Sequence, residues 1–353
     1  MKMSQSWARQ QHEVLLLARN GDSETDPFEF YGVERIFEIV KLPRPNIKKI
    51  GGVLYAGRNV RFLRKQEKQP DLVYGRITQG VLAAALVGYP VIYESHGSPA
   101  SRSQMHLERR LFRSPNLKRF VVISQALRQE YIRIFPWLLD QVEVLVAHDG
   151  ADPIAKGIDP EPINLKGRDG ALQVGYVGHL YPGKGAEIVL QTAEQMPEVD
   201  FHLVGGTEED ICFWKSRTAL PNVVFHGFVP HGQIHSYQQR MDILLLPPQQ
   251  KVSMYAGNGD IGRWMSPLKM FEYMAVGKPI IASDLPVLRE VLRNGENCLL
   301  CKVDRIEEWV AAIRKLQFDP QFSLKLGQSA LNEFMACYTW DARAKRVLDG
   351  IKI

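Results

Sequence analysis

The strongest constraint on the fold is a regular alternation of short apolar runs with amphipathic segments, which extends through most of the chain. Apolar runs predict strands at, for example, 91–94 and 172–177, and helical periodicity predicts helices at 78–87 and 186–195. Strands that alternate with helices favour parallel sheets with helices on both faces. The sequence therefore predicts an α/β protein with doubly wound sheets.

The alternation is interrupted once, and the interruption predicts two domains. Residues 151–170 contain three prolines and three glycines and show little periodicity. A chain of 353 residues is also longer than one hydrophobic core usually serves. We expect an N-terminal lobe at 1–152, a linker at 153–170 and a second lobe at 171–335. Doubly wound sheets bind ligands at the carboxyl ends of their strands, so we expect an active site between the lobes.

Membrane spans, secretion and metal binding are not favoured by the sequence. The longest apolar run, 81–93, is too short to cross a bilayer, and residues 1–14 lack the apolar stretch of a secretory signal. We therefore expect a cytoplasmic protein. Cys298 and Cys301 form a CxxC pair, but no second pair completes a zinc site, so we expect no metal and no disulfide framework.

The basic residues are concentrated in one segment. Residues 41–68 contain nine lysines and arginines and one acid, Glu67. Many of them recur at three- and four-residue steps, as on one face of a helix predicted at 52–68. Three interpretations stay open: a solvated helix face, contact with an anionic membrane surface, and nucleic-acid binding. The last lacks a recognised motif, and we predict no nucleic-acid partner.

Two segments of the second lobe have the pattern of a phosphate site. Residues 178–185, Gly-His-Leu-Tyr-Pro-Gly-Lys-Gly, link a predicted strand to a predicted helix, where glycines let the backbone approach an anion and Lys184 adds a charge. Residues 266–279 predict a helix with Ser266 as N-cap, Pro267 at the first helical position and Gly277 after its end. Two alternatives stay open: residues 178–185 are a plain connector, and residues 266–279 form a surface helix with an exposed Glu272.

These two segments, in this order, resemble the retaining glycosyltransferases of family 4, which have the GT-B architecture of two Rossmann-like lobes facing a cleft. The likeness extends over nearly the whole chain and includes the ESHG segment around His96. It implies a C-terminal helix, 336–353, that returns to the N-terminal lobe. It also implies transfer of a sugar from a nucleotide-sugar, with stereochemistry retained, and no cofactor or metal.

The resemblance also assigns roles to individual residues. It implies that His96, Lys184 and Glu272 are catalytic residues, with His96 on the donor sugar, Lys184 on the diphosphate and Glu272 on the ribose. The donor-binding set that it implies is Gly178, His179, Gly183, Lys184, Phe228, Val229, Ser266, Pro267, Leu268, Lys269 and Glu272. Within that set the backbone amides of Leu268 and Lys269 hold the phosphate or sugar. Glu290 and Asp260 are further candidates.

The sequence departs from the family pattern in three places. His179 stands where the family has an arginine, and a single imidazole cannot bind a diphosphate as a guanidinium does. Trp264 stands where the family has the first of two glutamates, a loss for which Asp260, Ser266 or Lys269 would compensate. The usual opening strand is not recognisable, so we expect either a start within a longer protein or an incomplete N-terminal lobe.

The predicted partners follow from this resemblance and from the charge. We expect a UDP-sugar donor and a glycan or lipid-linked acceptor of cell-surface polysaccharide synthesis, with peripheral membrane contact through residues 41–68. Two other functions stay open. One is a nucleotide-sugar 2-epimerase of the same architecture, and the other is a nucleotide-sugar-binding subunit of low activity.

Overall fold

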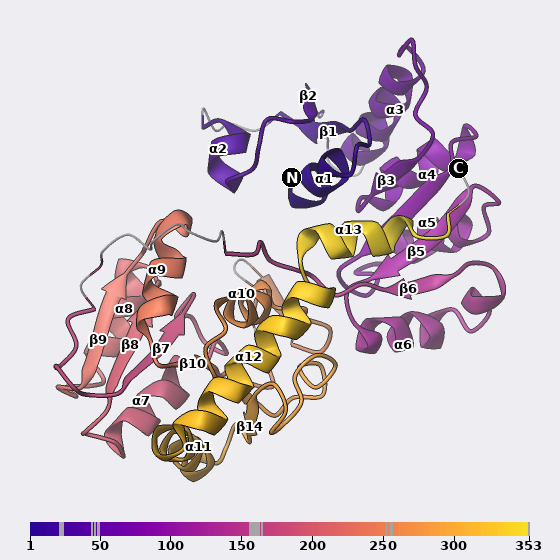
Figure 1. The fold of residues 1–353 in the computed structure, drawn as a ribbon. Helices are drawn as coiled ribbons and strands as arrows, with labels where there is room; N and C mark the ends of the chain where they lie inside the picture. The colour runs from indigo at the N-terminus through magenta and orange to yellow at the C-terminus, as the bar shows by residue number, and fades with distance from the viewer. Residues whose placement is uncertain are drawn as a thin grey trace. The chain divides into compact units, whose positions relative to one another are not determined.

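The computed structural model of the chain describes residues 1–20, 25–43, 45, 47, 50–154, 163, 165–251, 253–254, 257–260 and 262–351. The chain divides into two compact units (Figure 1). Unit 1 comprises Met1–His148 and Trp340–Ile353, and unit 2 comprises Asp149–Thr339. Each unit contains a parallel sheet with helices, so the prediction of an α/β fold is confirmed.

Unit 1 is built around a parallel sheet in the strand order β3-β4-β5-β6, accompanied by a parallel pair of β1 and β2. Its strands are β1 (Leu15–Arg19), β2 (Glu38–Leu42), β3 (Val73–Gly75), β4 (Val91–Ser95), β5 (Leu117–Val122) and β6 (Val144–Val146). Its helices are α1 (Lys2–Arg9), α2 (Pro27–Tyr31), α3 (Gly51–Leu63), α4 (Thr78–Leu86), α5 (Arg102–Phe112), α6 (Gln125–Ile134) and α13 (Trp340–Leu348), with a 3₁₀ turn, η1, at Leu138–Asp140.

The last helix of the chain is part of the core of unit 1. The buried side chain of Trp7, on α1, donates its indole N–H to the carbonyl of Ala344 on α13 at 3.0 Å. Trp7 and Ala344 pack in one cluster with Ile92 of β4 and Val121 of β5. The expected return of the C-terminal helix to the N-terminal lobe is confirmed.

Unit 2 contains a sheet in the strand order β14-β13-β10-β7-β8-β9, in which every pair is parallel. Its strands are β7 (Gln173–Val177), β8 (Asp200–Val204), β9 (Val223–Gly227), β10 (Ile243–Leu246), β13 (Ile280–Ser283) and β14 (Leu299–Cys301), and a short pair, β11 (Ser253–Met254) and β12 (Gly257–Asp260), stands apart. Its helices are α7 (Ala186–Glu194), α8 (Glu208–Lys215), α9 (Ile234–Arg240), α10 (Leu268–Val276), α11 (Ile306–Phe318) and α12 (Pro320–Cys337), with a 3₁₀ turn, η2, at His231–Gln233.

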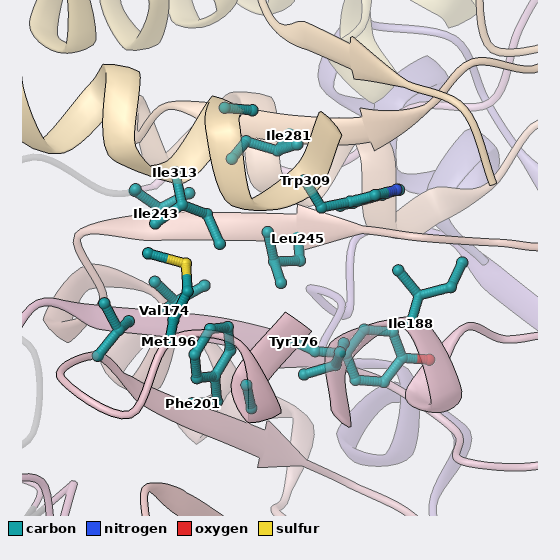
Figure 2. Packing of buried hydrophobic residues seen from close by; sticks show 14 of the residues in the cluster. Val174, Tyr176, Ile188, Met196, Phe201, Ile243, Leu245, Ile281, Trp309 and Ile313 are labelled. Atoms are coloured by element: carbon teal, nitrogen blue, oxygen red, sulfur yellow. The ribbon is translucent and has the colours of Figure 1, made fainter. Parts of the chain in front are cut away.

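Both faces of this sheet are buried, as the apolar strands predict. Ile243 and Leu245 of β10 belong to one core cluster, and Leu244 and Leu246 belong to the other. This alternation follows from the two-residue period of a strand. Figure 2 shows the side chain of Trp309, which is contributed by α11, lying against the strand that carries Ile243 and Leu245.

Two expected helices differ from the structure. The helix expected at 52–68 ends at Leu63, because Lys65 and Gln66 close three-residue turns onto Phe62 and Leu63 instead of continuing the α-helical pattern. Residues 287–292, where the apolar pattern also predicts a helix, form a series of overlapping turns, in which the carbonyl of Leu288 accepts from the amides of both Val291 and Leu292. Both errors fall at helix ends or short turns, where apolar periodicity carries little information.

No helix among the residues that the structure describes has the length and apolar character needed to span a membrane. The short elements α2 and β2 lie in a region to which the sequence assigned no element.

A pair of histidines lies on two neighbouring strands of unit 2, His202 on β8 and His226 on the edge strand β9. The amide oxygen of Gln173 is 2.6 Å from Nε2 of the buried His202, so this nitrogen carries the hydrogen. Nδ1 of His202 then accepts from Nε2 of His226 at 3.0 Å, which requires His202 to be neutral. Burial, followed by the neighbouring His202, lowers the pKa of His226 from 6.5 to about 4.

This pair predicts that unit 2 loses stability in mild acid. His226 is protonated near pH 6.5 in the unfolded chain and near pH 4 in the folded chain. The contribution of the neutral His226 to the free energy of unfolding is therefore complete above pH 6.5 and is lost as the pH falls towards 4. We expect the denaturant midpoint of the wild type to fall more steeply over this window than that of His226→Gln. Equal slopes for the two proteins would contradict the prediction.

Candidate functional site

The strand order of unit 2 makes the carboxyl end of β7 the candidate ligand site. The chain winds from β7 towards β8 and β9 on one side and towards β10, β13 and β14 on the other. In doubly wound sheets such a reversal is the place where ligands bind, at the carboxyl ends of the strands. The segment that follows β7 is the glycine-rich segment 178–185.

This segment is fixed by groups from the core of unit 2. The hydroxyl of Tyr176 donates to the carbonyl of His179 at 2.6 Å, and the indole of Trp214 donates to the carbonyl of Leu180 at 2.8 Å. Gly185 begins α7 with φ +97°, and a Cβ there would meet the carbonyl oxygen of Pro247 at 1.9 Å. Glycine at this position therefore allows the loops after β7 and β10 to meet.

The segment after β10 makes a second contact with the same loop. The amide of Gln249 donates to the carbonyl of Gly183 at 2.9 Å. Gly183 itself has φ +88°, in the left-handed region that favours glycine. The glycines of this motif thus serve the loop's backbone geometry, whereas Lys184 carries its charge.

Helix α10 begins close to this loop, but its N-cap differs from the prediction. Pro267 is the N-cap, and the hydroxyl of the buried Ser266 accepts from the amide of Asp149 at 2.8 Å instead of capping the helix. Ser266 therefore ties α10 to the start of unit 2. Leu268 and Lys269 occupy the first turn, where backbone amides have no partner within the helix.

A buried hydroxyl joins α10 to the end of β7. The amide of Val177 donates to the hydroxyl of Tyr273 at 2.8 Å, and both residues are buried. At its other end the helix stops at Gly277, whose φ of +72° gives the left-handed C-cap that the sequence predicts.

The charged candidates of unit 2 are brought together around these two elements. The ammonium of Lys269 lies 3.9 Å from the ring centroid of Tyr176. Burial first and then the positive charge of Lys184 lower the pKa of Lys269 to about 7, and Glu272 opposes this shift. Burial lowers the pKa of His179 as well, and Lys184 and Lys269 add to that shift. Lys184, Lys269, Glu272 and His179 therefore form one electrostatic cluster.

The remaining candidates of unit 2 lie on other segments. Phe228 follows β9 with 81% of its surface exposed, whereas the neighbouring Val229 is buried. Trp264 lies under the guanidinium of Arg263 at 5.3 Å. Glu290 is partly buried in the turns after β13, and Asp260 ends β12 with its side chain outside the described part of the chain.

His96, the candidate in unit 1, follows β4 and is held by a buried carboxylate. Its Nε2 donates to Oε1 of Glu94 at 2.6 Å. Glu94 has no exposed surface and accepts on its other oxygen from the guanidinium of Arg343 at 2.9 Å. The hydroxyl of Tyr74 and the guanidinium of Arg76 complete its partners.

These partners keep Glu94 ionised. Burial acts to raise its pKa, but the charge of Arg343 and the hydrogen bond from His96 outweigh burial and hold the pKa well below its usual range. Glu94 is not among the residues that the sequence indicated. The available signal was its position two residues before His96, at the end of the predicted strand.

No group of three or more His, Cys, Asp or Glu side chains able to hold a metal occurs among the described residues. Cys298 and Cys301 are buried free thiols, and burial raises the pKa of each to about 12.

Comparison with known proteins gives matches to both halves of the chain. A family model described as Glycosyltransferase Family 4 matches residues 1–153. A second model, described as Glycosyl transferases group 1, matches residues 171–319.

Individual proteins agree with these models. TuaH of Bacillus subtilis, named as a teichuronic acid biosynthesis glycosyltransferase, is 30% identical over 129 residues, 36% of this chain and 30% of TuaH. The chain spans 30% to 59% of the length of three curated relatives that it matches, TuaH among them.

Solved structures show the fold over nearly the whole chain. Sucrose-phosphate synthase from Thermosynechococcus elongatus has a TM-score of 0.68 at 17% identity and covers 98% of this chain and 90% of its own. HepE from Anabaena, solved in complex with UDP, has a TM-score of 0.67 at 17% identity, with 96% and 99% covered. The two-lobe architecture expected from the sequence is confirmed.

Proposed function

Because this chain belongs to the glycosyltransferases of family 4 and has their GT-B fold, we propose that it transfers a sugar from a UDP-sugar to an acceptor with retention of configuration. The observation that carries the proposal is the cluster of Lys184, Lys269 and Glu272 beside the carboxyl end of β7, at the reversal of the strand order. Cations and free helix amides at such a point favour a diphosphate.

The proposed reaction exchanges one bond for another on the same face of the sugar. The bond between the anomeric carbon and the diphosphate oxygen breaks, and a bond from that carbon to the acceptor oxygen forms. The acceptor's proton passes to the departing phosphate oxygen, so no carboxylate nucleophile takes part. Lys184 and the amides of Leu268 and Lys269 stabilise the negative charge that develops on the diphosphate.

The other site residues take positioning roles in this proposal. Glu272 accepts hydrogen bonds from the ribose hydroxyls, because its carboxylate has no hydrogen-bond partner among the residues that the structure describes. Phe228 and Val229 frame the base. His96 contacts the sugar through Nδ1, which accepts from a sugar hydroxyl, because Nε2 donates to Glu94 and so fixes the orientation of the ring.

The relatives support the choice of donor and acceptor. HepE is a protein of this fold solved with UDP, and TuaH is named for the synthesis of teichuronic acid. We therefore propose UDP as the nucleotide and a glycan or lipid-linked acceptor of cell-surface polysaccharide synthesis as the second substrate. A cytoplasmic site of action is supported by the four free cysteines, which fit a reducing compartment.

Ligand binding and product analysis test the proposal together. UDP-sugars should raise the melting temperature more than GDP- or ADP-sugars do, because a ligand that binds only the folded state stabilises it. Sugar should then reach an added acceptor extract. Conversion of the donor without any acceptor would indicate an epimerase, and tight binding without turnover would indicate a binding subunit.

Lys184→Ala should lower kcat by at least about tenfold, because it removes a charge that stabilises the leaving diphosphate. Lys215→Ala, which removes a lysine from α8, serves as the control and should retain wild-type turnover. Wild-type kcat in Lys184→Ala, measured with the donor identified above, would contradict the assigned role.

The surface of α3 supports peripheral contact with an anionic membrane. Val53 and Leu54, at the start of the helix, are 61% and 43% exposed. Arg61 lies on the same exposed face two turns later, and Lys65 follows the helix end. Apolar side chains beside basic ones favour a headgroup surface, to which each basic residue contributes about 1 kcal/mol. Arg44, Lys48 and Lys49, also expected in this patch, lie outside the described residues.

Vesicle sedimentation measures this contact. The wild type should pellet with vesicles containing phosphatidylglycerol at low salt and should stay in the supernatant with phosphatidylcholine alone. Arg61→Glu/Lys65→Glu should reduce the pelleted fraction severalfold, whereas Lys215→Glu/Lys325→Glu, with the same change in net charge, should not. Equal pelleting of the two variants would exclude α3 as the contact.

A further inference from the structure

We propose that the side chain of Lys269 binds the diphosphate of the donor jointly with Lys184, so that two ammonium groups from different elements hold one pyrophosphate. The inference rests on the proposed function, and it adds the side chain of Lys269 as a second cationic group that contacts the diphosphate. From the sequence, Lys269 is expected to bind the phosphate or sugar through its backbone amide or to compensate for the glutamate missing at Trp264, and its side chain has no assigned role on the diphosphate.

The position of the Lys269 side chain is the first support. A Cβ placed on Gly178 would lie 2.3 Å from Nζ of Lys269 and 2.6 Å from its Cε. The glycine at the first position of the loop therefore makes room for the end of this lysine. The ammonium reaches from the first turn of α10 to the backbone that follows β7, and the ring of Tyr176 lies beneath it at 3.9 Å.

The charge balance at this position is the second support. Within the part of the chain that the structure describes, no carboxylate lies within salt-bridge distance of Lys184 or Lys269. Glu272 is the acid whose charge favours the ammonium form of Lys269, and Lys184 opposes it. Two cations that share a partly buried site are stabilised by an anion of two or more charges placed between them.

The direction of the surrounding groups favours a diphosphate over a single carboxylate. Lys184 precedes α7 and Lys269 lies in the first turn of α10, so both lysines belong to segments at helix N-termini, which also attract anions. A nucleoside diphosphate carries charge on two linked phosphoryl groups, and each lysine can serve one of them. A lysine binds phosphate as a point charge and needs no planar geometry.

The first test compares Lys269→Met with Lys278→Met, a control that follows the other end of α10. Calorimetric titration of UDP and of inorganic pyrophosphate should show at least a tenfold weaker Kd for Lys269→Met and wild-type Kd values for Lys278→Met. Affinity for uridine should be equal in all three proteins. If the wild-type protein binds none of UDP, GDP and ADP, the proposed function is refuted. If Lys269→Met binds UDP with the same Kd as the wild-type protein, this inference alone is refuted.

The second test uses the wild-type protein and depends on no variant folding correctly. Free Lys269 is largely neutral at pH 8, and an anion restores its proton, so UDP binding should take up about one proton. The titratable groups that face Lys269 are Lys184, Glu272, Tyr176 and His179.

Proton uptake is read from titrations in buffers of different ionisation enthalpy. It should persist in His179→Asn, which excludes the imidazole as its source, and it should vanish in Lys269→Met. If Lys269 merely packs on Tyr176, the wild type will bind UDP without proton uptake, and the inference will be wrong.

Discussion

The parallel pairing of β7 with both β8 and β10 is the constraint on which the site of unit 2 depends. Helices cover both faces of the sheet, so the loop that follows β7 lies at the carboxyl end of the strand. In this class of fold, ligands bind at that end, where the strand order reverses. On one side this loop contacts the loop after β10, where Gly185 approaches Pro247. On another side the end of β7 is joined to α10 by the hydrogen bond from the amide of Val177 to the hydroxyl of Tyr273. Charge placed on either element therefore reaches the same point.

Several features of the site could be predicted from the sequence because they depend on local geometry. The glycines at 183 and 185 indicate left-handed backbone after a strand, and both have positive φ in the structure. Gly277 indicates the end of α10 for the same reason. The core also follows a local pattern, since alternate residues of β10 face opposite clusters. In each case the residue type and its neighbours determine the outcome.

Features that depend on contacts between distant segments could not be predicted in this way. Ser266 has the side chain of an N-cap, but it binds the amide of Asp149, which is 117 positions away. The salt bridge between Glu94 and Arg343 spans 249 positions and depends on the packing of α13 in unit 1. The side chain of Lys269 is a similar case, because its direction is set by the ring of Tyr176 and by the space at Gly178.

The lowered pKa of Lys269 also bears on how the proposed diphosphate site would exist without its ligand. Two fixed ammonium groups in a partly buried site repel each other, and this repulsion would destabilise unit 2. Lys269 relieves it by releasing its proton near neutral pH, which leaves Lys184 as the charged member of the pair. An arriving diphosphate reverses the balance, because each new negative charge favours the ammonium form. Under the proposed binding, the anion completes the protonation of Lys269 at neutral pH, so the same burial that lowers its pKa strengthens the bound state.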